Sequence, residues 1–104
     1  MGSFPKKGQA IVTAIATIAV PGTQAALSTT RVFCNWLVIQ ALSTNTDDII
    51  IGGTNADLAT NLGVRLAARN TVTLDNVYLS EVFLDVAVGG QGVQYTYQEK
   101  RKIT

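Results

Sequence analysis

The 104-residue sequence contains no histidine, a single cysteine and only 14% charged residues. Histidine is the side chain that most often moves protons near neutral pH, so its absence excludes a Ser-His-Asp or Cys-His catalytic arrangement. A single cysteine cannot form a disulfide within the chain, and Cys34 lies in an apolar run typical of a core residue. We therefore expect a protein that is not an enzyme and that uses no cofactor or metal.

The low charge also bears on what covers the surface. A chain of this length supports one hydrophobic core, so we expect a single domain. Soluble monomers carry about 25% charged residues, whereas this chain has eight basic and seven acidic residues. The deficit indicates that other subunits cover much of the surface. The alternative is a monomer whose surface is coated by Thr, Asn and Gln.

The charges that are present are unevenly distributed. Residues 8–98 hold three arginines against six carboxylates, whereas the two terminal segments are basic. The terminal basic residues are Lys6, Lys7, Lys100, Arg101 and Lys102. We therefore describe residues 1–104 as one domain with basic arms at 1–9 and 99–104, which could hold an acidic neighbour or phosphates, or could simply aid solubility. No aromatic residues alternate with these cations, so we expect no nucleic-acid partner.

The N-terminal apolar stretch, residues 10–20, is too short to span a bilayer and ends at Pro21-Gly22. Threonines interrupt it, so we expect neither a signal peptide nor a membrane partner.

That stretch is better explained as a β-strand. Seven of residues 11–20 are β-branched, which favours a strand even though Ile11, Ile15 and Ile18 also fit helical spacing. Neither face of the strand is clearly polar. Burial on both sides is expected for a strand at a subunit interface or between two sheets.

Turn signals recur at intervals of about 8 to 12 residues along the rest of the chain. Further strands are predicted over residues 23–27, 32–42, 49–51, 63–67, 71–74, 82–88 and 93–98. Asp75-Asn76 is expected to end the strand at 71–74. About seven or eight short antiparallel strands without a long helix predict an all-β fold, either a single-domain β-sandwich or a small jelly-roll-like barrel.

Four groups of residues are candidate carriers of chemistry. Asp47, Asp48, Asn55 and Asp57 could supply oxygen ligands to Ca²⁺, but the spacing of an EF-hand is absent and a solvated turn explains them better. Gly52-Gly53 lacks the lysine of a phosphate-binding loop.

Aromatic and acidic residues offer two more alternatives. Trp36, Tyr95 and Tyr97 could form a platform for a sugar ring, or could fill a core or an interface. The carboxylates available for glycoside hydrolysis are Asp75, Glu81 and Asp85, and only their presence supports that function.

Over residues 36–97 the pattern of strands and turns resembles small virion proteins of tailed bacteriophages. The segments that carry the resemblance are residues 38–46, 49–53, 61–66, 71–74, 82–86 and 90–93. The chain departs from that family at Asp47-Asp48, where a tight turn is usual, and at Arg69-Asn70, where a Gly-Glu turn is common. The resemblance implies a structural component of a virus particle and implies no active site.

We therefore expect a capsid decoration or cement protein on the exterior of a virion, with the major capsid protein as its partner. The basic residues of both arms are expected to contact the shell. Ile11, Ile15 and Ile18 are expected to mediate self-association, with a trimer favoured. The alternative is a tail or fibre protein that binds host carbohydrate through Trp36 or the tyrosines.

Overall fold

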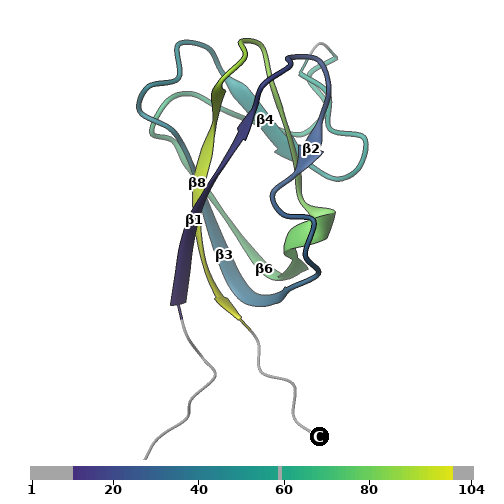
Figure 1. Ribbon diagram of the computed structural model, residues 1–104, viewed down its shortest axis with the longest axis vertical. Helices are drawn as coiled ribbons and strands as arrows, with labels where there is room; N and C mark the ends of the chain where they lie inside the picture. Colours follow the sequence, from purple (N-terminus) through teal and green to yellow (C-terminus); the bar gives the residue numbers. More distant parts are fainter. Residues whose placement is uncertain (1–10, 59, 100–104) are drawn as a thin grey trace, which may run out of the picture.

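Eight strands form two antiparallel sheets that pack face to face (Figure 1). The computed structural model describes residues 11–58 and 60–99. The strands are β1 (Ile11–Ile18), β2 (Ala25–Ala26), β3 (Phe33–Ala41), β4 (Ile49–Gly52), β5 (Val64–Leu66), β6 (Thr71–Tyr78), β7 (Phe83–Val86) and β8 (Gln91–Glu99). A single 3-10 turn, η1 (Leu79–Glu81), separates β6 from β7.

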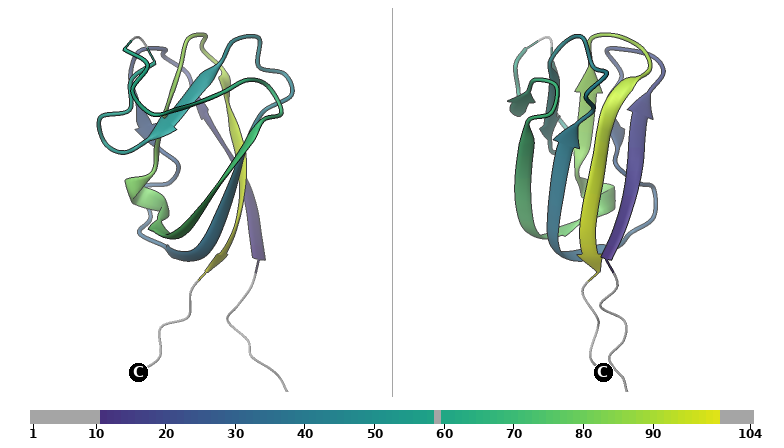
Figure 2. Two further views of the ribbon diagram at one scale, coloured as in Figure 1. Left: turned by 180° about the vertical axis from the view of Figure 1, so that it is seen from behind. Right: turned by 90° about the vertical axis from the view of Figure 1, so that its left-hand side faces the viewer.

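Sheet A has the strand order β1-β8-β3-β6, and sheet B has the order β2-β7-β4-β5. Figure 2 shows the four strands of sheet A side by side, with β1 at one edge and β6 at the other. The two sheets are separate and do not close on each other, so the fold is a β-sandwich rather than a barrel. This confirms the all-β prediction, and each of the eight predicted strands is present.

One predicted strand boundary is wrong. Asp75-Asn76 does not end β6, which continues to Tyr78. Asn76 adopts a left-handed backbone conformation (φ 55°), which asparagine tolerates better than most residues, and the strand resumes beyond it. Val77 and Tyr78 then pair with the first two residues of β3.

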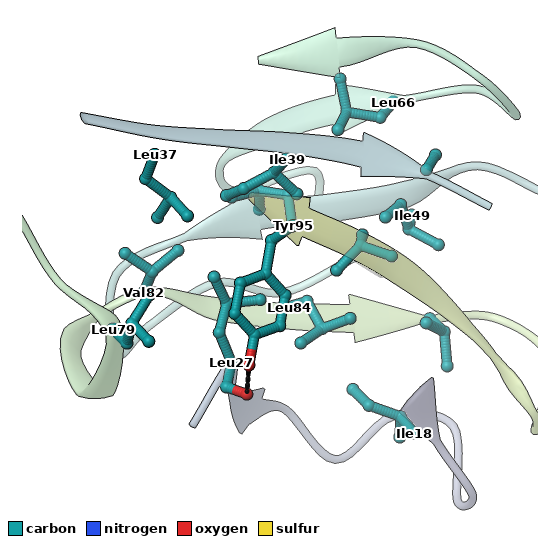
Figure 3. Packing of buried hydrophobic residues seen from close by; sticks show 14 of the residues in the cluster. Ile18, Leu27, Leu37, Ile39, Ile49, Leu66, Leu79, Val82, Leu84 and Tyr95 are labelled. Carbon is teal, nitrogen blue, oxygen red and sulfur yellow. Dashed lines mark hydrogen bonds between the residues drawn. The ribbon is translucent and has the colours of Figure 1, made fainter. Parts of the chain in front are cut away.

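The core lies between the sheets and follows the alternation of the strands (Figure 3). Leu37 and Ile39 of β3 are fully buried, and Tyr95 of β8 packs beside them. The Tyr95 hydroxyl donates a hydrogen bond to the Leu27 carbonyl at 3.3 Å, which satisfies its one polar group inside the core. Ile18 at the end of β1 is also part of this cluster.

The outer side of sheet B is covered by the connection between β4 and β5. Ile50 is fully buried although it lies outside the central cluster, and an added Cβ at Gly63 would lie 3.1 Å from its Cγ1. Asp85 of β7 is only 3% exposed, and its two oxygens accept hydrogen bonds from the N–H groups of Leu58 and Val86, both at 2.9 Å. A buried carboxylate thus anchors this connection to the sheet.

A second polar anchor joins β8 to the connection between β3 and β4. The Asn45 side chain donates to the Gly92 carbonyl at 2.9 Å and accepts from the Gly92 N–H at 3.2 Å. Gly92 also lies against β1, because a Cβ added there would lie 2.0 Å from the Ala16 carbonyl oxygen. Only glycine allows the backbones of β1 and β8 to approach this closely.

Replacing Gly92 by alanine should therefore lower the free energy of unfolding by about 2 kcal/mol or more, because β1 must move away from β8. Urea unfolding followed by Trp36 fluorescence would measure this. Gly53→Ala is the matched control, since its nearest neighbour would be at 3.8 Å, and it should change stability by less than about 0.5 kcal/mol. Equal stability of the two variants would contradict the close approach of β1 and β8.

Candidate functional site

The most distinctive surface of the described residues is the edge of sheet A formed by β1. This strand pairs with β8 on one side, and its other side is an edge of the sheet. Ile11 and Ile15 point away from the core and are 61% and 65% exposed. Two large apolar side chains on one edge strand are unusual for a soluble monomer surface, so this edge is a candidate contact surface.

Ile18 does not belong to that surface. The sequence groups it with Ile11 and Ile15, but Ile18 is only 5% exposed and packs in the core. The reason is the two-residue period of a strand, which places an even-numbered residue on the opposite face from Ile11 and Ile15. Its expected role in self-association is therefore corrected to a role in the core.

The outer face of sheet A is an ordered, nearly uncharged polar surface. Side chains bond across neighbouring strands in three pairs: Thr13 with Thr96 at 3.0 Å, Gln94 with Gln40 at 2.7 Å, and Asn35 with Gln98 at 2.9 Å. Asp75 of β6 is the one acidic residue on this face among the described residues. Cross-strand hydrogen bonds between neutral side chains therefore order this face.

The five basic residues of the arms, Lys6, Lys7, Lys100, Arg101 and Lys102, lie outside the described residues. The points at which both arms join the domain are nevertheless described. Ile11 pairs with Gln98, so the chain enters β1 and leaves β8 at the same end of sheet A (Figure 1). The sequence shows two basic ends, and the antiparallel pairing of β1 with β8 attaches them to one end of the domain.

The domain between the arms has the opposite charge. Residues 10–98 hold three arginines and six carboxylates, a net charge of −3, whereas the two arms hold five cations and Glu99, a net charge of +4. Two exposed ion pairs lie within the domain, Arg65 with Asp48 and Arg31 with Glu81, each at 3.5 Å. Arg31 also lies over the Tyr78 ring, with its guanidinium carbon 4.0 Å from the ring centre. Exposed pairs of this kind stabilise weakly, so the separation of charge is the stronger feature.

The candidate Ca²⁺ ligands do not assemble into a site. No group of three or more acidic or cysteine side chains that could hold a metal ion occurs within residues 11–58 and 60–99. Asp48 is paired with Arg65 instead. The Gly52-Gly53 segment forms a turn, in which the Ala56 N–H donates to the Gly53 carbonyl at 3.0 Å.

The aromatic and acidic candidates are also separated. Tyr95 and Tyr97 alternate with the outward residues of β8 and pack at the core, with ring centres 6.1 Å apart, whereas Trp36 lies on the outer face of sheet A. The three residues therefore do not form one platform. The candidate acids Asp75, Glu81 and Asp85 lie on β6, η1 and β7 respectively, and Asp85 is covered by the β4–β5 connection.

Cys34 is fully buried at the end of sheet A that carries the arms. Burial raises the pKa of its thiol from 9.0 to about 11, and the negative charge of Glu99 adds to the effect. Burial likewise raises the pKa of the Tyr95 and Tyr97 hydroxyls. A thiol in this environment is a core side chain and not a nucleophile.

In the part of the chain that the structure describes, no helix has the length and apolar character needed to cross a membrane.

Comparisons with known protein families, with curated proteins and with solved structures found no match to this chain. The resemblance to virion proteins of tailed bacteriophages stays a prediction from the sequence.

Loss of the Asp85 carboxylate should lower the free energy of unfolding more than loss of the Asp75 carboxylate. Asp85→Ala leaves the buried N–H groups of Leu58 and Val86 without partners, so the free energy of unfolding should fall by about 2 kcal/mol. Asp75→Ala removes an exposed carboxylate and should cost less than about 0.5 kcal/mol. Denaturant unfolding of both variants measures the difference, and similar values would refute the anchoring role of Asp85.

The Cys34 thiol should react with a disulfide reagent at pH 8 at least ~100-fold more slowly in the folded protein than in urea, because a two-unit rise in pKa removes that much thiolate. Because the thiol ionises more readily in the unfolded chain, the fold keeps its full stability below pH 9.0 and loses stability as pH rises toward about 11. Cys34→Ala should therefore reduce the loss of stability that begins near pH 9, and leave the further loss caused by the two tyrosines. An unchanged pH profile would count against this.

Proposed function

We propose that this protein is a structural component of a virus particle, most specifically a capsid decoration protein that binds across neighbouring major capsid subunits and stabilises the shell. The sequence resemblance suggests the kind of particle. The observation that carries the proposal is the attachment of both basic arms to one end of an acidic β-sandwich.

The separation of charge would orient the domain on an acidic surface. The arms, with five cations, join the domain at the start of β1 and the end of β8, while residues 10–98 have a net charge of −3. Lys7 is four residues from Ile11 and Lys100 follows Glu99 directly. The short chain between them and the domain limits these two cations to the end formed by Ile11 and Glu99. At the other end, the β3–β4 connection carries Asp47 and Asp48. Asp48 is paired with Arg65 and Arg69 lies at this end too, so the cations of the arms, rather than repulsion of the opposite end, would orient the domain on an acidic shell.

The stabilisation would follow from mass action and would require no chemistry at an active site. A protein that binds the assembled shell but not the separate subunits stabilises the shell in proportion to the logarithm of its concentration over its dissociation constant. Two arms on one domain could engage two subunits, and linked contacts of this kind raise the overall affinity.

The alternative, recognition of a host carbohydrate, has less support. Carbohydrate binding by stacking uses exposed aromatic faces, and of the three candidates only Trp36 lies on an outer face, where it is half-buried.

The proposal predicts that the arms control binding to the particle. Particles from the source of this chain would be purified, depleted of the protein and mixed with purified chains, and bound copies per shell subunit would be counted by quantitative mass spectrometry. Changing Lys6, Lys7, Lys100, Arg101 and Lys102 to glutamate should reduce occupancy at least ~10-fold. Binding of the unaltered chain should weaken as salt rises.

Arg69→Glu is the control, because it reverses a charge on the connection before β6, beside the Gln40 end of β3 and away from the arms. This variant should bind as the unaltered chain does. Unchanged occupancy of the arm variant, or absence of the chain from the particles, would refute the proposal.

A further inference from the structure

β1 is a sheet edge without the usual protection against pairing with another strand. It is eight residues long, contains no charge and no proline, and pairs with β8 in one continuous register. The whole segment 8–30 lacks a charged residue. Natural edge strands are generally short, charged, bulged or covered, because a long neutral edge pairs with other strands.

The other three edge strands of the described residues do show such protection. β2 has two residues and β5 has three, with Arg65 in the middle of β5. β6 is long but carries Asp75 and a left-handed residue, Asn76. This contrast with the other three edges indicates that the β1 edge can pair with a further strand.

The backbone groups of β1 alternate between β8 and the open edge. The Ile18 carbonyl accepts a hydrogen bond from the Gly90 N–H, and the Ala16 carbonyl faces Gly92. In an antiparallel ladder the residues that face one partner alternate along the strand. Thr13, Ile15 and Thr17 therefore direct their N–H and C=O groups to the open edge.

We propose that the β1 edge pairs with β1 of a second copy of this chain, antiparallel, about a two-fold axis at Ile15. In this register Ile15 lies opposite Ile15 of the second copy, and Thr13 lies opposite Thr17. The three outward-directed residues of each strand form about six backbone hydrogen bonds between the copies. The two sheets A then join into one continuous sheet, and the exposed Ile15 side chains contact each other across the axis.

The neutral β1 strand favours pairing with another β1 strand, and the positive charge of the arms favours the antiparallel direction. A neutral strand has no charged side chain to pair with a charged partner, whereas two neutral strands can pair without electrostatic repulsion. Antiparallel pairing sends the two sets of basic arms to opposite ends, about 26 Å apart along eight residues of strand. That exceeds the screening length of about 10 Å at 0.1 M salt. A parallel pair would place ten positive charges together.

This arrangement differs from the trimer expected from the sequence, because an isologous strand pair closes as a dimer. It concerns the isolated protein and does not rest on the proposed function, because the arms enter only through the charge that favours the antiparallel direction. On a shell, copies that all direct their arms toward it could not keep this pairing, so the dimer would separate on binding.

Sedimentation equilibrium of the purified full chain, from micromolar to millimolar concentration, tests the dimer. The unaltered protein should reach twice the chain mass of 11.0 kDa. Ile15→Lys removes the apolar contact and places two like charges opposite each other at the axis, so it should weaken the dimer ~10-fold. Val64→Lys adds the same charge at an exposed valine on the edge strand β5 and should leave the dimer intact.

Amide hydrogen exchange on the unaltered protein provides a second test that needs no variant. The amides of Thr13, Ile15 and Thr17 should become protected as the concentration rises, while those of Ala14 and Ala16 should be protected at every concentration. A monomer at millimolar concentration, a trimer, a dimer of Ile15→Lys as tight as the unaltered one, or concentration-independent exchange at Ile15 would each overturn the proposal.

Discussion

The antiparallel pairing of β1 with β8 is the contact on which the other features depend. It places Ile11 beside Gln98 and so attaches both basic arms to one end of the domain. It also buries Ile18 in the core and leaves Ile15 exposed on the outer face. The close approach of the two strands at Gly92, and the two hydrogen bonds between Asn45 and that glycine, hold this register. A one-residue slip would exchange the two faces of β1.

Most of the fold could be predicted from the sequence, because the strands alternate clearly and glycine, proline or asparagine marks their ends. The alternation of Leu37 and Ile39 with Trp36 places β3 correctly. The end of β6 could not be predicted in this way, because Asn76 fits both a turn and a left-handed residue within a strand. The choice between sandwich and barrel depends on which strands are neighbours, and local patterns carry little of that information.

The candidate site was only partly visible in the sequence. The basic ends and the neutral strand are evident from composition, but their relation depends on the pairing of residues 87 positions apart, Ile11 with Gln98. Ile18 is expected from the sequence to mediate self-association because both faces of this strand are apolar, and the sequence alone does not show which face packs in the core; the face that carries Ile18 does. The buried anchor Asp85 has no local signal, since its partners Leu58 and Val86 are backbone groups brought to it by the fold.

The measurement that tests the account most directly is electron cryo-microscopy of particles that carry this chain, at a resolution that orients the sandwich. The account predicts many copies on the shell, each with the end formed by Ile11 and Glu99 against the boundary between capsid subunits and the Asp47-Asp48 end turned outward. Copies confined to a tail or vertex, or copies whose Asp47-Asp48 end faces the shell, would contradict it.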